Sequence, residues 1–430
     1  MPSTLVESSL KSDLLGRSRP EGWADLRDRA EARLAAQELP RTRDEDWKYL
    51  DLKALAGSGF VPAQRVEVDI QDFILPEAKG TRLVFVNGRF DPHHSSVIGL
   101  PAGVRFMHLQ QCSELACALG TLTLPEQSDF FANLNSARFE EGALVLVPKG
   151  VQVGTVLHVV FLTKAEPGRP VFTLPRLLVV LEGGAELTLV EEHAGEGRYL
   201  SAPVVEVLVH AGARLRHERI QRESAEAFHL ASLDARVERG GRYESRTVTL
   251  GAILSRQTPR VLLAEEEAEL QLDGLALLGG AQIADTHSFI DHAQPRCSSR
   301  QLHKCIADGS GRAVFNGRIM VRPGAQQTDA QQQSRNLILA ESARVDTKPQ
   351  LEIFADDVKC AHGAAIGQLD PEEVFYLQSR GLSPQLARNL LTYGFASDLL
   401  GRLAVPSLRR QLRQAVLART QAGTDLEGLG

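Results

Sequence analysis

The sequence predicts a mainly β protein with a repetitive β core, flanked by an N-terminal region and a C-terminal region that are helical at least in part. Between residues 142 and 369, short β-type runs alternate with turns that contain glycine. Related segments, such as Gly-Ala-Glu-Leu at 184–187 and Gly-Ala-Arg-Leu at 212–215, recur at steps of roughly 26 to 31 residues, with one step near half that length. Repetition without intervening helices favours a β-solenoid. Spacing alone leaves a β-sandwich open as the alternative.

Residues 1–141 are expected to form a mixed, partly helical domain. Apolar residues at steps of three and four predict a helix over 20–37, which Pro40 ends. The acidic-aromatic segment 44–49 is expected to be a solvated turn anchored by Trp47. The strand-like run from Arg82 enters an Asn-Gly pair at 87–88, which predicts a β-hairpin. A further helix is expected near 113–119.

Residues 370–430 are expected to form a small helical domain. Asp370 is a predicted N-cap followed by a proline at the first helical position, and Gly381 ends that helix. Ser383 caps a second helix, and a third starts near Ser407. The tail 423–430 is expected to be disordered. The apolar positions expected to face inward in the second and third helices are Leu386, Leu390, Leu391, Leu408, Leu412, Val416 and Leu417.

The composition excludes several classes of protein. In 430 residues, 48 basic and 54 acidic side chains give a net charge of -6, which argues against a nucleic-acid-binding surface. The longest apolar runs are too short to cross a bilayer, and the first residues do not resemble a signal peptide. Five cysteines in a chain of this length do not form a disulfide framework. We therefore expect a soluble cytoplasmic protein with reduced thiols.

The candidate site is a cysteine and a histidine separated by one residue, Cys360 and His362. The alternation of Leu351, Ile353 and Ala355 with polar residues predicts a strand just before them. Residues two apart in an extended segment point to the same side, so the thiol and the imidazole could reach one ligand together. A thiolate beside an imidazole suits iron, an iron–sulfur unit or zinc. Two ligands alone remain a weak signal, and a packed cysteine beside an ordinary histidine is the commoner arrangement.

Several segments spread over most of the chain have a distinctive sequence: Asp44-Glu-Asp-Trp-Lys-Tyr49, Gln301-Leu-His-Lys304, Gly311-Arg-Ala-Val-Phe-Asn-Gly-Arg-Ile319, Thr347-Lys-Pro-Gln-Leu-Glu-Ile353, Ala355-Asp-Asp-Val-Lys-Cys-Ala-His-Gly-Ala364 and Phe375-Tyr-Leu-Gln-Ser-Arg-Gly381. In these segments the chain resembles the SufB/SufD family, the paralogous scaffold subunits of an iron–sulfur cluster assembly machine. The SufB branch typically has an amino-terminal cysteine motif and a cysteine shortly before the segment that matches Thr347. This chain has no cysteine at 340–346 and no Cys-x-x-Cys, so it resembles the SufD branch more closely.

The resemblance implies a fold and a set of partners. It implies a right-handed parallel β-helix over 142–369, flanked by the two helical regions. It further implies a non-enzymatic subunit of a SufBCD complex that pairs edge-to-edge with a SufB-like paralogue. A transient iron–sulfur cluster or iron would form at that interface, with His362 and then Cys360 as ligands. A homodimer stays open as well.

The energy for assembly would come from a partner. No Gly-x-x-x-x-Gly-Lys-Ser/Thr loop occurs in the sequence, so we expect no nucleotide on this chain. The resemblance implies that a SufC-like ABC ATPase docks on the C-terminal helices. The expected docking positions are Phe375, Tyr376, Gln378, Arg380, Gln385 and Arg388.

Other chemistry-bearing residues give weaker signals. His287, His292, Cys297, His303 and Cys305 lie within nineteen residues but fit no standard metal motif. Of these, His303 and Cys305 would share a strand face, which makes them a secondary ligand pair. Cys112 and Cys117 are expected to be structural. The adjacent acids at 356–357 would point to opposite faces of a strand, which disfavours a β-helix carbohydrate enzyme. A purely structural clamp subunit is the other alternative.

Overall fold

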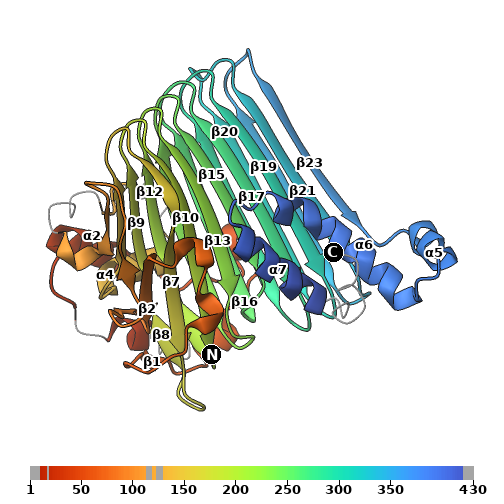
Figure 1. The fold of residues 1–430 in the computed structure, drawn as a ribbon, viewed down its shortest axis with the longest axis horizontal. Coiled ribbons are helices and arrows are strands. Elements are labelled where there is room, and N and C mark those ends of the chain that lie inside the picture. Colours follow the sequence, from red (N-terminus) through yellow and green to blue (C-terminus); the bar gives the residue numbers. More distant parts are fainter. Residues whose placement is uncertain (1–9, 17–18, 113–118, 123–128, 420–430) are drawn as a thin grey trace.

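The computed structural model describes residues 10–16, 19–112, 119–122 and 129–419. Figure 1 shows a long stack of parallel strands with helices at both ends of the chain. The helix expected near 113–119, apart from its last residue, and the tail expected at 423–430 lie outside the described ranges. Cys117 lies outside them too.

The core is a parallel β-helix, which confirms the predicted fold class. Within the described residues, its strands alternate between a 12-stranded and an 11-stranded sheet, so each coil adds one strand to each sheet. In the 12-stranded sheet the coils contribute β9 (Arg176–Leu181), β12 (Val204–Val209), β14 (Phe228–Val237), β16 (Leu254–Leu263), β18 (Ile283–His292), β20 (Arg312–Val321) and β22 (Arg344–Ile353). In the 11-stranded sheet they contribute β7 (Gln152–Lys164), β10 (Glu186–Glu196), β13 (Arg214–Arg222), β15 (Arg242–Thr249), β17 (Glu269–Leu278), β19 (Ser298–Ala307), β21 (Asp329–Ile338) and β23 (Lys359–Gly367).

The repeated segments at 184–187 and 212–215 mark the turns that enter β10 and β13 of the 11-stranded sheet. Gly184 and Gly212 have φ values of 70° and 68°, a left-handed conformation that glycine adopts without steric cost. The following strands then pair in register, with Leu187 beside Leu215. These two similar turns therefore place the side chains of β10 and β13 in columns.

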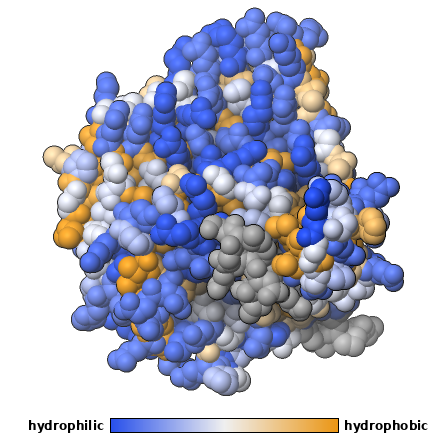
Figure 2. Space-filling model, turned by 45° about the vertical axis from the view of Figure 1, so that its right-hand side comes forward, coloured by the Kyte–Doolittle hydropathy of each residue, from blue (hydrophilic) through white to orange (hydrophobic). Residues whose placement is uncertain are grey.

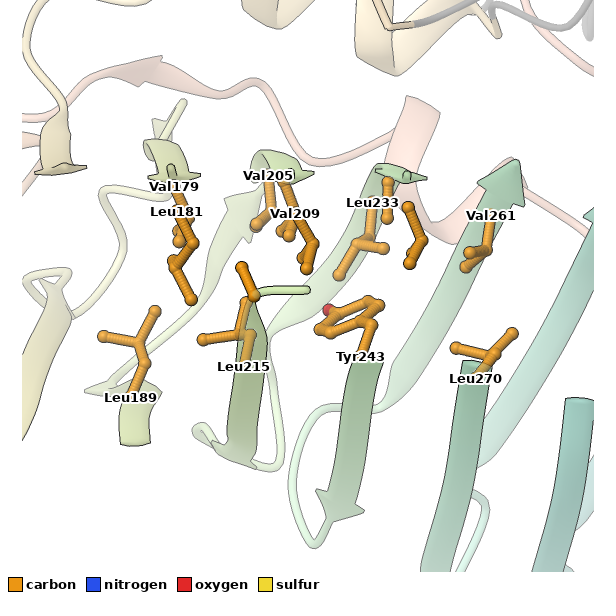
Figure 3. Close-up of a cluster of buried hydrophobic side chains, with 14 of the residues drawn as sticks. Val179, Leu181, Leu189, Val205, Val209, Leu215, Leu233, Tyr243, Val261 and Leu270 are labelled. Atoms are coloured by element: carbon orange, nitrogen blue, oxygen red, sulfur yellow. The ribbon is translucent and has the colours of Figure 1, made fainter. Parts of the chain in front are cut away.

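Apolar columns from the two sheets meet in the lumen of the solenoid. Figure 3 shows a row from the 11-stranded sheet facing a row from the 12-stranded sheet. The first row is Leu189, Leu215, Tyr243 and Leu270, and the second includes Val179, Val205, Leu233 and Val261. All are nearly free of solvent contact. Aliphatic residues dominate this core, which agrees with the low aromatic content of 5%.

The N-terminal region closes one end of the solenoid. Its hairpin forms as predicted, since β2 (Thr81–Val86) pairs antiparallel with β3 (Arg89–Phe90) and Asn87 has a φ of 53°. The predicted first helix begins later than expected, at Ala24. The remaining elements of this end are α2 (Ala24–Ala36), α3 (Lys53–Ala56), α4 (Phe130–Arg138), β1 (Val61–Pro62), β4 (Ser96–Val97), β5 (Arg105–His108), β6 (Ala143–Val147), β8 (Val171–Thr173), β11 (Tyr199–Ser201) and the 3-10 turns η1 (Glu45–Trp47), η2 (Gln71–Phe73), η3 (Pro76–Ala78) and η4 (Leu109–Gln111). Because β2 and β5 extend the two sheets, the domain boundary at 142 stays a prediction.

Three helices follow the solenoid: α5 (Pro371–Ser379), α6 (Pro384–Gly401) and α7 (Pro406–Arg419). The side chains of Asp370 and Ser383 cap α5 and α6 as predicted. The apolar faces of α6 and α7 pack on the outer face of the 11-stranded sheet, with Leu400 and Leu408 fully buried.

The prediction that three leucines form the buried side of α6 was wrong. Leu386, Leu390 and Leu391 are half-buried. The buried positions are instead Ala387, Asn389, Thr392, Ala396, Leu399 and Leu400. Small side chains let the helix approach the sheet closely, so that face turns inward.

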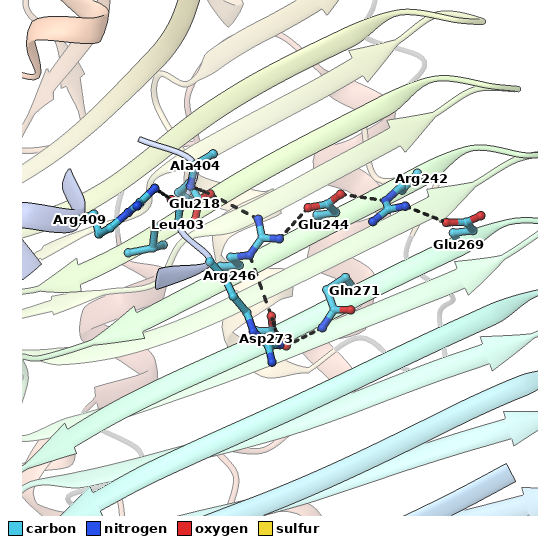
Figure 4. Close-up of polar contacts among 11 residues, drawn as sticks. Glu218, Arg242, Glu244, Arg246, Glu269, Gln271, Asp273, Leu403, Ala404 and Arg409 are labelled. Atoms are coloured by element: carbon cyan, nitrogen blue, oxygen red, sulfur yellow. Dashed lines mark hydrogen bonds and ion pairs between the residues drawn. The ribbon is translucent and has the colours of Figure 1, made fainter. Parts of the chain in front are cut away.

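A buried ionic network joins the α6–α7 connection to the solenoid. The carboxylate of Glu218 accepts the backbone N–H of Ala404 at 2.9 Å, and Arg246 lies between Glu218 and Glu244. Figure 4 shows this network running across three strands of the sheet. Burial raises the pKa of Glu218 to about 7. The C-terminal helices are thus anchored by polar contacts as well as by apolar contact.

Candidate functional site at the open end of the solenoid

Both sheets end in an open edge at the C-terminal end of the solenoid. Strand β22 is the last strand of one sheet and β23 the last of the other, each paired on one side only within the described residues. Figure 1 shows β23 at the outer margin of the stack. Large apolar side chains lie exposed beside these edges: Ile366 is 47% exposed and Phe354 is 60% exposed. Figure 2 turns this side of the molecule forward and shows apolar patches on a mostly hydrophilic surface. An open edge with unpaired backbone groups favours pairing with another chain.

Cys360 and His362 lie on β23, and the predicted extended segment is confirmed. Their register partners on β21 are Ala330 and Gln332, which are completely buried and point into the lumen. Because side chains alternate along a strand, Cys360 and His362 face the lumen as well. The two residues therefore share one face, at the open end of the solenoid. Their Cα atoms are about 6.6 Å apart by strand geometry.

The two side chains differ in exposure. The Cys360 side chain packs against the apolar core and is half-buried, whereas His362 is exposed. Partial burial raises the pKa of the Cys360 thiol, so the thiol form is favoured until a metal or a base takes the proton. The imidazole of His362 is accessible to a partner chain or an incoming metal ion.

A residue that sequence reasoning missed lies directly beneath His362. Gln332 is fully buried, and neither of its side-chain polar atoms has a hydrogen-bond partner in the described structure. It lines, with His362 and Ser334, an open hollow of about 310 Å³ between β21 and β23. The sequence Asp329–Asn336 is polar at nearly every position, so no contrast between apolar and polar residues marks its inward face. The run of three glutamines at 331–333 is the one sequence feature that distinguishes this segment.

The predicted secondary ligand pair, His303 and Cys305, does not lie beside Cys360 and His362. His303 and Cys305 share the lumen-facing side of β19, as expected, but they lie two coils further inside than β23. Burial lowers the pKa of His303 to about 3 and raises that of Cys305 to about 12. Both groups are therefore neutral at physiological pH. Their metal role stays a prediction.

The other candidate ligands are also spread apart. His287 points to the outer face of its sheet and pairs with Asp285 at 3.0 Å. Cys297 is buried, with its thiol 3.2 Å from the carbonyl of Glu265. Cys112 is buried and lies 3.2 Å from Arg105, in agreement with a structural thiol. Across the described ranges, no three His, Cys, Asp or Glu side chains are grouped so that they could hold a metal ion.

The expected docking positions on α5 and α6 are mostly exposed. Phe375 and Tyr376 are 70% and 57% exposed, and Gln378 is half-buried. Arg380, Gln385 and Arg388 are exposed. Helix α5 buries none of its residues. A helix that displays aromatic side chains and buries nothing is a candidate contact surface.

Two family models cover this chain. One, described as the SufBD core domain of SUF system FeS cluster assembly, matches residues 161–395, and the SufBD protein N-terminal region matches residues 10–159. An iron–sulfur cluster assembly SufBD family protein of Synechocystis is 38% identical over 94% of this chain and 91% of its own length. The iron–sulfur cluster assembly protein SufD of Escherichia coli is 32% identical over 90% of each chain. A chloroplastic protein of Arabidopsis thaliana, ABCI7, is 32% identical over 91% of this chain and 85% of its own length. No helix in the described part of the chain is long and apolar enough to span a membrane.

Proposed function

Because the chain belongs to the SufBD family of iron–sulfur cluster assembly proteins and is SufD-like, we propose that it is a subunit of a cytoplasmic SufBCD complex. In this proposal it pairs with a SufB-like paralogue, and a nascent cluster forms between the two subunits. A SufC-like ATPase supplies the energy. The chain itself acts as a scaffold and catalyses no reaction alone.

The observation that carries the proposal is the position of Cys360 and His362 on an edge strand that is paired on one side only in the described structure. A partner that adds its own strand to β23 brings its side chains to the same open end of the lumen. A stable metal site needs three or four ligands, and this chain supplies two. The remaining ligands would then come from the partner, which explains why the site is incomplete in one chain.

Helix α5 supports the second partnership. Its exposed Phe375 and Tyr376 lie just after the edge strand, and aromatic anchors carry much of the binding energy in protein interfaces. In the proposal an ATPase docks on this helix and on the exposed face of α6. Nucleotide hydrolysis there would act on the neighbouring edge strand, because β23 ends at Gly367 and α5 begins at Pro371.

Replacement of His362 tests the ligand role. His362→Ala should lower the iron and acid-labile sulfide bound by the purified complex, while the complex keeps its mass. His93→Ala is the matched control, because His93 is an exposed histidine in a loop after β3. Unchanged iron and sulfide content in the His362 variant would contradict the ligand assignment.

The second candidate function is a purely structural clamp. The exposure of Ile366 and Phe354 along the open edge favours it, because these side chains contribute to pairing and not to metal binding. In that case the double variant Cys360→Ala, His362→Ala assembles clusters as well as the wild type. A loss of assembly in the double variant, with the complex intact, rejects the clamp.

A further inference from the structure

Polar side chains form a row along the lumen of the solenoid, which a glycine interrupts at one coil. On the 11-stranded sheet, one register position is occupied in successive coils by Glu191, Arg219, Thr247, Gly274, His303 and Ser334. At about 4.8 Å per coil, the row is about 24 Å long. Next to its outer end, a second row reads Gln301, Gln332 and His362. The polar row therefore leads from the interior to the open end of the solenoid.

Several polar atoms along this route have no hydrogen-bond partner in the described structure. They are Gln257 Oε1, Gln301 Nε2, His303 Nε2 and both polar atoms of Gln332. All four side chains are at least nine-tenths buried. Buried polar atoms almost always have a partner, and ordered water is the usual one where the protein supplies none.

The lumen also has space for water. A cavity of about 40 Å³ lies beside His303, and its walls include the side chains of Thr247, Gln257 and Thr286. A single water needs roughly 10–15 Å³ of such volume, so the cavity holds about three. Walls with hydroxyl, amide and imidazole groups favour water over an empty cavity.

Glycine makes room for polar side chains of the lumen at two points. A Cβ atom at Gly274 would lie 2.7 Å from Nδ1 of His303, and one at Gly317 would lie 2.3 Å from Nε2 of Gln332. The backbone is extended at both positions, so conformational freedom does not explain the glycines. The room that the polar side chains need does explain them.

The inner end of the row is a buried ionic cluster. The carboxylate of Glu191 contacts His193 at 2.6 Å, His217 at 3.0 Å and Arg219 at 3.3 Å. A second carboxylate, Glu223, contacts His229 at 2.7 Å. Two carboxylates therefore face one arginine and three imidazoles at this end of the row. Each of these side chains is at most a few per cent exposed.

We propose that a file of ordered waters beside His303, together with the polar side chains of the row, connects the Glu191 cluster to the open end of the solenoid and exchanges protons along this route. Each water in the file accepts one proton and releases another, so the water is not consumed. The ligand is water, and the proposal stands whether or not a metal binds at His362.

Three consecutive glutamines supply a matched test. Gln332 faces the lumen, whereas its neighbour Gln331 is exposed on the same strand. Gln332→Leu replaces the amide by an apolar group of similar size at the outer end of the file, and Gln331→Leu is the control. The readout is exchange of imidazole N–H protons of the buried histidines with water, measured by NMR on the isolated chain labelled with 15N-histidine.

The expected result is that Gln332→Leu slows this exchange at least tenfold, while Gln331→Leu leaves it within twofold of the wild type. Exchange of backbone amides in β15 and β17 should stay unchanged in both variants. This control distinguishes a loss of proton transfer along the water file from a change in local unfolding. Equal imidazole exchange in the two variants overturns the proposal.

If Gln332→Leu does not fold, Thr247→Val provides the same test, because valine keeps the shape of threonine and removes only the hydroxyl. It should slow exchange to a similar extent. Water itself is counted in parallel by magnetic relaxation dispersion. Several long-lived internal waters are expected in the wild type and fewer in the Thr247 variant, and a dry lumen overturns the proposal. Because no partner or metal enters these measurements, their outcome is independent of the scaffold function.

Discussion

The guanidinium carbon of Arg256 lies 4.1 Å from the centroid of the Trp47 ring. The same guanidinium donates to the carbonyl of Asp46 at 2.7 Å and to Asp285 at 2.6 Å. Trp47 is 6% exposed and also contacts Phe131. The N-terminal segment is thus fixed to the outer face of the solenoid by a cation–π contact, in agreement with the structural role predicted for Trp47.

Trp47→Ala should lower the free energy of unfolding by about 3–5 kcal/mol, because it removes a buried ring and leaves Arg256 less well packed. Urea denaturation measures the change. Lys48→Ala is the control, since Lys48 is exposed, and it should change the free energy of unfolding by less than about 0.5 kcal/mol. Similar values for the two variants would contradict the anchoring role.

Glu218 should make stability depend on pH. Its folded-state pKa of about 7 is above the ordinary value of 4.5, so its contribution to stability is complete below pH 4.5 and is lost as pH rises to about 7. This pKa difference corresponds to about 3 kcal/mol. Glu218→Gln cannot ionise and keeps an acceptor for the Ala404 N–H. Relative to this variant, the wild type should lose stability between pH 4.5 and pH 7.5 in urea titrations. A constant difference between the two proteins across that range would count against the assignment.

A charge on the open edge should prevent pairing with the SufB-like partner. Ile366 is 47% exposed on β23, so Ile366→Asp should be tolerated in the free chain but places a carboxylate in the interface. We expect loss of co-elution with the partner in size-exclusion chromatography. Ile98→Asp is the control, because Ile98 is 69% exposed beside β4 at the other end of the solenoid. Normal pairing of the Ile366 variant would show that the edge is not the interface.

The aromatic pair on α5 should anchor the ATPase. Phe375→Ser combined with Tyr376→Ser should raise the Kd for a SufC-like partner at least a hundredfold, by analogy with other aromatic hot spots. Isothermal titration calorimetry measures it. The free chain should keep its thermal stability, since α5 buries none of its own residues. Val97→Ser removes an exposed apolar side chain elsewhere and should leave the Kd unchanged.

The repetitive β core and the helix caps could be predicted because local chemistry determines them. Gly184 and Gly212 mark coil turns, Asn87 marks a hairpin, and Asp370 and Ser383 mark helix starts. The choice of β-helix over β-sandwich came from family resemblance, since short strands with turns are common to both. The face of α6 that packs on the sheet was predicted incorrectly, because hydrophobicity favoured the leucines whereas close packing selected Ala387 and Ala396.

The site could be predicted only in part for a physical reason. Cys360 and His362 stand out as chemical groups, and strand geometry places them on one face. Gln332 and the polar row of the lumen do not stand out, because their strands carry polar residues on both faces. Which face is inward depends on register across coils almost thirty residues apart, which no local pattern records. The ligand roles of Cys360, His362, His303 and Cys305 remain predictions.

The most direct test of the central claim is anaerobic co-expression of this chain with the SufB-like and SufC-like proteins of the same source. Size-exclusion chromatography with mass measurement, followed by iron and sulfide analysis, gives the result. The scaffold account predicts one stoichiometric complex that contains all three chains and carries iron and acid-labile sulfide. Elution of this chain by itself, with the partners associated without it, would contradict the account.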